Sequence, residues 1–119
     1  MKNNLISILI TNYNKSKFLK KSLNSLFNQN YRNFEIILFD DCSEDNSIKI
    51  IKKFKKVKLI KNKKKLYNSG PMNQINGLIQ ALKYSKGKII CLMDADDFFN
   101  RNKLLVINNY FKKNPNNKI

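Results

Sequence analysis

The amino-acid sequence predicts an α/β protein with three layers, in which helices cover both faces of a mainly parallel, Rossmann-like sheet. Four short runs of apolar, mostly β-branched residues have the length of buried strands. Between these runs, apolar residues recur every three or four positions, as on one face of a helix. Strands that alternate with helices over short connections favour a parallel sheet with right-handed crossovers. With 119 residues the chain has room for one domain.

The strands are expected at residues 5–11, 34–39, 57–60 and 89–93. The first, second and fourth are nearly continuous apolar runs, which is typical of strands covered on both faces. The fourth follows the turn Lys86-Gly87-Lys88, and this turn separates it from the helical pattern before it.

Four helices are expected between and after the strands. Ser16 is expected to cap the first helix, and Ser43 or Asp45 to cap the second. The third begins at Pro71, which suits the first turn of a helix, and the fourth begins near Arg101. The apolar positions expected on the inner faces of the first three are Leu19, Leu23, Leu26 and Phe27; Ile48, Ile51 and Phe54; and Met72, Ile75, Leu78, Ile79 and Leu82.

The formal charge of +16 is the most unusual feature of the composition. A charge of this size is compatible with nucleic acid, an anionic membrane surface or an anionic substrate as partner. Of the 24 basic residues, however, only Arg32 and Arg101 are arginine, whereas groove-reading proteins concentrate arginine among aromatic residues. We therefore expect most of the lysines to be solvated and no nucleic acid to bind. No run of 18 apolar residues is present, so no transmembrane helix is expected.

Polar side chains follow three of the predicted strands. Tyr13 comes after the first strand, Asp40 and Asp41 after the second, and a group of acids after the fourth. Because the carboxyl ends of parallel strands meet at one edge of a sheet, where ligands bind, these clusters are expected to line one crevice.

The group of acids after the fourth strand consists of Asp94, Asp96 and Asp97. Carboxylates two positions apart at a strand end can reach one hard cation, and Mg²⁺ or Mn²⁺ leaves positions free for phosphate oxygens. The alternative interpretation is a turn and helix cap, because aspartate is common at such positions.

Four segments in this order resemble the amino-terminal half of a family 2 glycosyltransferase with the GT-A fold. The opening strand and its turn, the segment into the second strand, the acidic turn after it and the segment of the fourth strand carry the resemblance. They read Ile8-Leu9-Ile10-Thr11-Asn12-Tyr13-Asn14; Ser25-Leu26-Phe27-Asn28-Gln29-Asn30-Tyr31-Arg32-Asn33-Phe34-Glu35-Ile36-Ile37; Asp40-Asp41-Cys42-Ser43-Glu44-Asp45; and Lys86-Gly87-Lys88-Ile89-Ile90-Cys91-Leu92-Met93-Asp94-Ala95-Asp96-Asp97.

The resemblance implies that the chain binds a nucleoside diphosphate sugar with Mn²⁺ or Mg²⁺, for transfer to an acceptor hydroxyl with inversion. It implies that Asp94 and Asp96 hold the metal, with Asp94 also facing the ribose. Asp41 matches the acid that accepts the uracil imide N–H, which favours a UDP-linked sugar. Thr11 and Tyr13 match the wall of the base pocket.

The chain departs from the family pattern in two places. Many members carry an arginine in the segment after the Gly70-like position, and the alignment places Ile75 there, with Lys64 or Lys65 as substitute cations. The general base of the family lies beyond the last acidic motif, so no catalytic residue is expected within the chain. Residues 1–119 are accordingly expected to form a single partial GT-A domain without the acceptor-binding half, inactive or incomplete on its own.

Other classes of protein share part of this pattern. A phosphatase of the haloacid dehalogenase type also ends a strand in Asp-x-Asp, but on its first strand rather than its last. The non-enzymatic alternative is a basic α/β module that binds nucleic acid or an anionic membrane.

The lone Cys42 and Cys91 indicate a reducing, cytoplasmic location. Because many family members act on lipid carriers in cell-envelope polysaccharide synthesis, peripheral association with the inner membrane face is compatible with this. The acceptor stays unknown. A sheet edge left open by a partial domain would favour a homo-oligomer.

Overall fold

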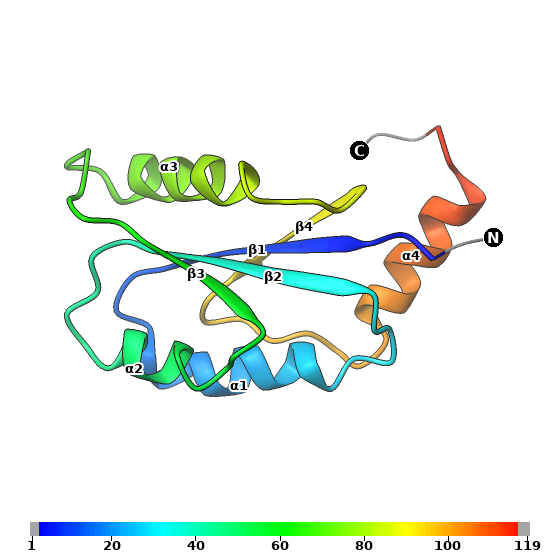
Figure 1. The fold of residues 1–119 in the computed structure, drawn as a ribbon, viewed down its shortest axis with the longest axis horizontal. Helices are drawn as coiled ribbons and strands as arrows, with labels where there is room; N and C mark the ends of the chain where they lie inside the picture. Colours follow the sequence, from blue (N-terminus) through cyan, green and yellow to red (C-terminus); the bar gives the residue numbers. More distant parts are fainter. Residues whose placement is uncertain (1–2, 117–119) are drawn as a thin grey trace.

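The structure, a computed structural model, describes residues 3–116 and alternates strands with helices along the chain. The strands are β1 (Ile6–Asn12), β2 (Phe34–Asp40), β3 (Val57–Lys61) and β4 (Ile89–Asp94). The helices are α1 (Ser16–Phe27), α2 (Ser47–Ile51), α3 (Gly70–Leu82) and α4 (Lys103–Lys113). All strand pairs are parallel, and the order across the sheet is β3-β2-β1-β4. The predicted three-layer fold is confirmed: α3 covers one face of the sheet, and α1 and α2 cover the other (Figure 1).

Two helices differ from the expectation at their ends. The second helix was expected to reach Phe54, but α2 ends at Ile51. The N–H of Phe54 donates to the Ile51 carbonyl (2.9 Å) in a tight turn that leads into β3, and its side chain still packs on the core. Ser16 is the first residue of α1 rather than its cap, since Lys15 holds the cap position. The cap position of α2 is likewise held by Asn46 and not by Ser43 or Asp45, although the Asp45 carboxylate accepts the N–H of Ser47, the first residue of the helix.

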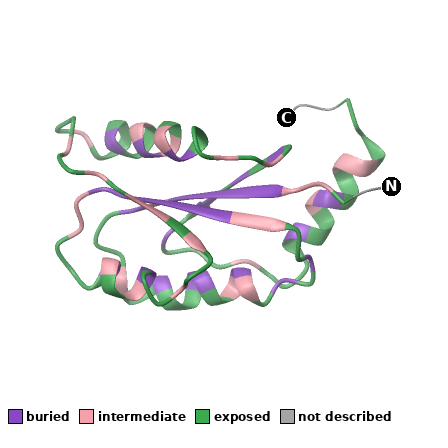
Figure 2. Cartoon of the chain, in the orientation of Figure 1, coloured by how far each residue is buried: buried purple, intermediate pink, exposed green. Residues whose placement is uncertain are grey.

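The larger part of the core lies on the face of the sheet that α1 covers, called the α1 face below. Every second residue of the strands points into it, together with the apolar stripe of α1 and Leu104 of α4. Figure 2 shows the buried residues concentrated in the strands and on the inner sides of the helices. On the opposite face, called the α3 face, Leu9, Ile37 and Phe39 pack against Ala81.

The inner face expected for the third helix was wrong. Of its five apolar positions, four are 44–50% exposed: Met72, Ile75, Ile79 and Leu82. The helix instead buries Asn73, Gly77 and Ala81, because the small residues Gly77 and Ala81 let its backbone lie close to the sheet.

Polar residues fix the segment that follows β4. The buried Gln29, at the end of α1, accepts the N–H of Leu104 (3.0 Å) and donates to the carbonyl of Asn100 (2.6 Å). The hydroxyl of Ser25 accepts the N–H of Phe99 (3.0 Å). Burying these backbone groups without partners would cost free energy, so Gln29 and Ser25 position the turn that carries the acids after β4.

A second polar cluster fixes the amino end of β4. Gly87 donates its N–H to the hydroxyl of Ser7 (2.8 Å), and a Cβ at Gly87 would lie 2.6 Å from the carbonyl oxygen of Leu5. The carboxylate of Glu35 accepts from the Ser7 hydroxyl (2.5 Å) and from the N–H of Lys86 (2.6 Å). These hydrogen bonds link β1, β2 and the start of β4 at the amino ends of the strands, opposite the acidic turns. No helix within residues 3–116 has the length and apolar character needed to span a bilayer.

Candidate functional site

The carboxyl ends of the strands open into a cavity of about 410 Å³. Strand pairing places Thr11 beside both Phe39 and Asp94, and Asn12 beside Asp40, so the turns after β1, β2 and β4 meet here. The first turn of α3 and the loop before it complete the wall. The lining residues are Thr11, Asn12, Tyr13, Lys15, Asp41, Lys65, Gly70, Pro71, Asn73, Gln74, Asp94, Ala95 and Asp96.

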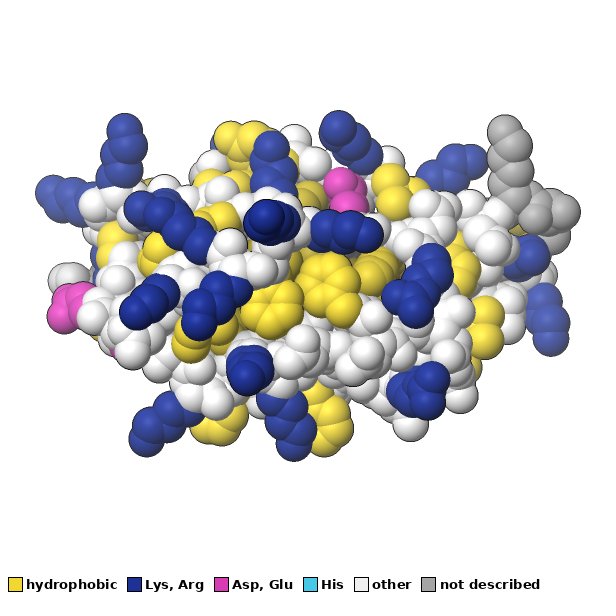
Figure 3. Space-filling model, turned by 60° about the horizontal axis from the view of Figure 1, so that its bottom comes forward, with side chains coloured by type: hydrophobic (Ala, Val, Ile, Leu, Met, Phe, Trp, Pro, Cys, Tyr) yellow, Lys and Arg dark blue, Asp and Glu magenta, His cyan; other side chains and the backbone are white. Residues whose placement is uncertain are grey.

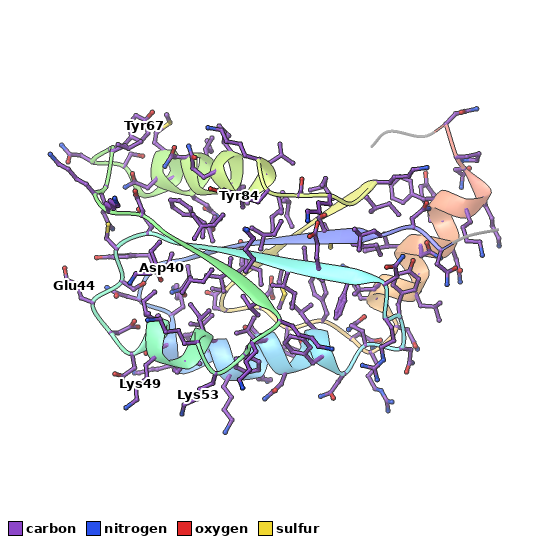
Figure 4. The ribbon with its side chains drawn as sticks, viewed as in Figure 1. Asp40, Glu44, Lys49, Lys53, Tyr67 and Tyr84 are labelled. Atoms are coloured by element: carbon purple, nitrogen blue, oxygen red, sulfur yellow. The ribbon has the colours of Figure 1, made fainter. Side chains whose placement is uncertain are left out.

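The two neighbouring acids after β2 have different environments. Asp40 is 2% exposed and accepts hydrogen bonds from the Asn12 amide (2.8 Å) and the Ser43 hydroxyl (2.7 Å). It therefore braces the turns after β1 and β2, at the end of β2 where Figure 4 labels it. Asp41 instead lines the cavity and accepts from the Asn62 amide (2.9 Å). Of the pair, Asp41 is the one available to a ligand.

A second set of hydrogen bonds ties the loop after β1 to the loop after β2. The amide oxygen of Asn14 accepts the N–H groups of Glu44 (2.8 Å) and Asp45 (3.3 Å). The Asp45 carboxylate accepts the N–H groups of Ser16 (3.0 Å) and Ser47 (2.9 Å). Partial burial raises the pKa of Asp45, but hydrogen bonds from Ser47 and Ser16 outweigh it and lower the pKa to about 2. These contacts fix the loop on which Tyr13 lies.

A lysine occupies the space between the aromatic ring and the acid of the cavity. The ammonium of Lys65 lies 3.1 Å from the centre of the Tyr13 ring and 3.9 Å from a carboxylate oxygen of Asp41. It makes a cation–π contact and an ion pair at the same time. The face of Tyr13 and the carboxylate of Asp41 are thus turned toward the same region of the cavity.

Asp94 and Asp96 line the same cavity and have separate partners. The amide of Gln74 donates to Asp94 (3.3 Å), and the ammonium of Lys15 lies 3.6 Å from Asp96. Residues 3–116 contain no cluster of three or more His, Cys, Asp or Glu side chains arranged as metal ligands. Two carboxylates beside an open cavity fit a Mg²⁺-like ion, which binds proteins through one or two carboxylates and completes its shell with phosphate and water.

Five of the predicted site residues line the cavity and one predicted acid does not. Thr11, Tyr13, Asp41, Asp94 and Asp96 are all brought to the cavity, whereas Asp97 is not among its lining residues. The N–H of Asp97 donates to the carbonyl of Asp94 (3.0 Å) and so closes the turn.

Ile75, which the resemblance places where many family members carry an arginine, does not line the cavity. The side chain that reaches the cavity from α3 is Gln74, while Ile75 is 50% exposed outside it. Successive residues of a helix point about 100° apart, so the side chain at position 74 faces the cavity and the one at position 75 does not.

Sequence analysis missed Asn12, Lys15 and Asn73 as lining residues. Their place at the end of β1, in the turn after it and in the first turn of α3 is the signal that could have suggested them. Asn12 is 2% exposed, and its amide oxygen is buried without a hydrogen-bond partner.

The fold and the cavity define a parallel α/β domain of the GT-A type, with a polar site at the carboxyl edge of its sheet. The sequence profile of Glycosyl transferase family 2 matches residues 7–118. The chain therefore belongs to glycosyl transferase family 2.

Two similar proteins are named as glycosyltransferases. The chain is 31% identical over 100 residues to the poly(ribitol-phosphate) beta-N-acetylglucosaminyltransferase TarS of Staphylococcus aureus, covering 82% of this chain and 17% of that protein. It is 34% identical over 102 residues to the UDP-Glc:alpha-D-GlcNAc-diphosphoundecaprenol beta-1,3-glucosyltransferase WfgD of Escherichia coli, covering 84% and 38%. The chain thus spans well under half the length of these relatives.

Solved structures show the same architecture. The crystal structure of S. aureus TarS 1-349 in complex with UDP superposes with a TM-score of 0.81 at 26% identity, over 91% of this chain and 32% of that one. A mannosyltransferase from Pyrobaculum calidifontis in complex with GDP-Man and Mn²⁺ superposes with a TM-score of 0.75 at 18% identity, over 87% and 31%, and shows the fold alone.

Proposed function

We propose that this chain binds a nucleoside diphosphate sugar, with uridine as the base, together with Mn²⁺ or Mg²⁺, as the donor-binding part of an inverting glycosyltransferase. The observation that carries the proposal is the single cavity that collects Tyr13, Asp41, Asp94 and Asp96. The aromatic ring of Tyr13 suits stacking on the base, and the carboxylate of Asp41 can accept the imide N–H of the base. The carboxylates of Asp94 and Asp96 suit a metal ion that binds the diphosphate. The relatives named for UDP-linked donors or solved with UDP support this choice of ligand.

Asp41 and Tyr13 are assigned to the base. Uracil presents an N–H donor at N3, which a carboxylate accepts, whereas cytosine has an acceptor at that position. An acceptor-only group in the cavity therefore favours uridine over cytidine, because cytosine would leave two acceptors facing each other. Stacking on Tyr13 adds affinity without selecting the base. Thr11 forms the wall beside it.

Asp94 and Asp96 are assigned to the metal, with Asp94 also near the ribose. Their two carboxylates would hold a divalent cation, which would supply positive charge against the leaving diphosphate. Gln74, in the first turn of α3, holds Asp94 by its amide in the absence of an arginine. Lys15 and Lys65 supply positive charge at the cavity rim.

No residue of the described chain is assigned as the general base. Among residues 3–116, the carboxylates that line the cavity are Asp41, Asp94 and Asp96, and each already has a binding role. The sequence contains no histidine. Transfer needs a group that takes the proton from the acceptor hydroxyl, so we expect these 119 residues alone to bind the donor with little turnover.

Calorimetric titration with UDP, with and without Mn²⁺, tests the proposal. We expect saturable binding that requires the metal and weakens about ten-fold or more in Asp96→Asn and Asp41→Asn, because each removes a charged partner. CDP should bind more weakly than UDP to the native chain. Asp97→Asn is the matched control, since this neighbouring acid lies outside the cavity lining and should bind UDP as the native chain does. Absence of UDP binding with metal present would overturn the assignment.

No observation favours the alternative of a basic module for nucleic acid or membrane. Lysine side chains are scattered over the face shown in Figure 3, with apolar and neutral surface between them, rather than gathered in one stripe. Salt dependence separates the two functions, because phosphate-backbone binding falls steeply with salt.

A further inference from the structure

Asn62, the residue that directly follows β3, contacts three successive residues at the end of β2. Its backbone N–H donates to the carbonyl of Asp40 (2.8 Å), and its carbonyl accepts a hydrogen bond from the thiol of Cys42 (3.4 Å). Its side-chain amide Nδ2 donates to Oδ1 of Asp41 (2.9 Å). Within the described chain Asn62 is not among the residues that line the cavity, so its effect on a ligand passes through Asp41.

The two carboxylate oxygens of Asp41 have different partners. Oδ1 accepts from the Asn62 amide, whereas Oδ2 lies 3.9 Å from the ammonium of Lys65 in the cavity. The same ammonium lies on the Tyr13 ring, so Oδ2 is the oxygen directed to the region beside that ring. The backbone of Asp41 is held separately, because its N–H donates to the carbonyl of Asn12 (2.9 Å). The hydrogen bond from Asn62 therefore sets the orientation of the carboxylate.

We propose that Asn62 determines the base specificity of the cavity as a positioning residue, by fixing the side chain of Asp41 with Oδ2 toward the base. The inference rests on the nucleotide site proposed above and names the residue that controls the choice between uracil and cytosine there. Asn62 itself does not touch the base.

Discrimination against cytosine requires a carboxylate that cannot turn away. Uracil has an N–H donor at N3, whereas cytosine has an acceptor at that position. A carboxylate that rotated freely would turn toward water and avoid most of the cost of two acceptors facing each other. With Asp41 held by Asn62, cytosine meets this cost in full, and uracil gains its hydrogen bond without ordering the side chain. The fixed orientation thus favours uracil and disfavours cytosine.

Lys65 does not fix the carboxylate in the same way. Its side chain is 34% exposed, and the distance of 3.9 Å to Oδ2 of Asp41 is longer than a hydrogen bond. A lysine ammonium lies on a flexible stem of four carbons, and it attracts a carboxylate without imposing one direction. Asn62 is instead fixed by its own backbone hydrogen bonds at the end of β3.

Calorimetric titration of the 119-residue chain with UDP and with CDP, both in the presence of Mn²⁺, tests this role. Asn62→Leu keeps the size of the side chain and removes its donor. We expect this variant to bind UDP about five- to ten-fold more weakly and CDP within about two-fold of the native chain, so that the preference for UDP falls. Damage to the fold alone would weaken both nucleotides alike.

Asn24→Leu is the matched control for this substitution. Asn24 is exposed on α1 and is not among the lining residues of the cavity. This variant should bind both nucleotides as the native chain does. Thermal unfolding of the two variants checks that each is folded at the temperature of the titration.

A second pair of variants tests the orientation itself. In Asp41→Asn, the Asn62 amide should still donate to the oxygen at position 41, which leaves an NH₂ group directed to the base. This donor matches N3 of cytosine, so the variant should prefer CDP to UDP. When Asn62→Asp is added, the carboxylate at position 62 accepts from that NH₂ group and turns the amide oxygen to the base. The double variant should therefore prefer UDP again.

The outcomes separate this inference from the nucleotide site on which it rests. A native chain that does not bind UDP overturns both. A native chain that binds UDP and CDP equally overturns the role of Asn62 alone. The same conclusion follows if Asn62→Leu keeps the full preference for UDP, or if Asp41→Asn and the double variant have the same preference.

Discussion

The two faces of the sheet are built to different degrees of completeness. Among residues 3–116, the α1 face has a core cluster of fifteen buried residues, whereas the α3 face has a cluster of four. On the α1 face the helices bury their apolar stripes, but α3 leaves Met72, Ile75, Ile79 and Leu82 between 44% and 50% exposed. The stability of the fold therefore rests mainly on the α1 face, because far fewer residues are buried on the α3 face.

The largest expected effect contrasts one leucine from each face. Leu38 is fully buried on the α1 face, so Leu38→Ala should lower the free energy of unfolding by about 2–5 kcal/mol. Leu92 is 58% exposed on the α3 face, so Leu92→Ala should change it by less than about 0.5 kcal/mol. Urea unfolding at low protein concentration measures both. Equal losses would show that the α3 face contributes as much as the α1 face.

A smaller effect is expected where α3 touches the sheet. A Cβ at Gly77 would lie 2.8 Å from Phe39 and 2.8 Å from Thr11, so Gly77→Ala should destabilise the protein by about 1–3 kcal/mol. Gly70→Ala, at the start of the same helix, meets nothing within 4 Å and should have an effect within about 0.5 kcal/mol. Thermal unfolding of the two variants compares them. If Gly77→Ala instead stabilised the protein, as alanine usually stabilises a helix, α3 would not pack closely against the sheet at this position.

The smallest effect is expected at Asp45, in the loop after β2. The pKa of Asp45 is lowered to about 2 in the folded chain, from an ordinary value of 3.8. Its stabilising contribution should therefore be complete above pH 4 and disappear as the pH falls toward 2. Asp45 is exposed, so solvent screening keeps this contribution below about 1 kcal/mol.

The native chain and Asp45→Asn should accordingly differ in unfolding free energy at neutral pH and converge at about pH 2. Urea titrations at a series of pH values measure this difference. A constant offset across the range would mean that the hydrogen bonds from Ser16 and Ser47 do not depend on the charge of Asp45.

Much of the fold could be predicted from the sequence because its signals are periodic. Strand positions followed from apolar runs, and the parallel sheet followed from their alternation with helices. The same reasoning brought Tyr13, Asp41, Asp94 and Asp96 to one edge, where the structure has the cavity.

What the sequence could not supply depends on local backbone geometry. Cys42 adopts a left-handed conformation (φ 61°) directly after the two acids, in a turn that buries Asp40 and leaves Asp41 at the cavity. No periodic pattern encodes that choice. Gln29 illustrates the same limit: its motif was recognised, but its bonds to Asn100 and Leu104 join positions more than 70 residues apart.

The position of Lys65 has a consequence for how the cavity would respond to a ligand. With its ammonium on the Tyr13 ring and beside Asp41, the lysine already holds the two groups that we assign to uracil. Nucleotide binding would then be an exchange reaction, in which a base replaces a cation on the same aromatic face. The measured affinity would then be the difference in binding free energy between the nucleotide base and the Lys65 ammonium at this position. The association rate would be limited by how often the Lys65 side chain leaves the Tyr13 ring.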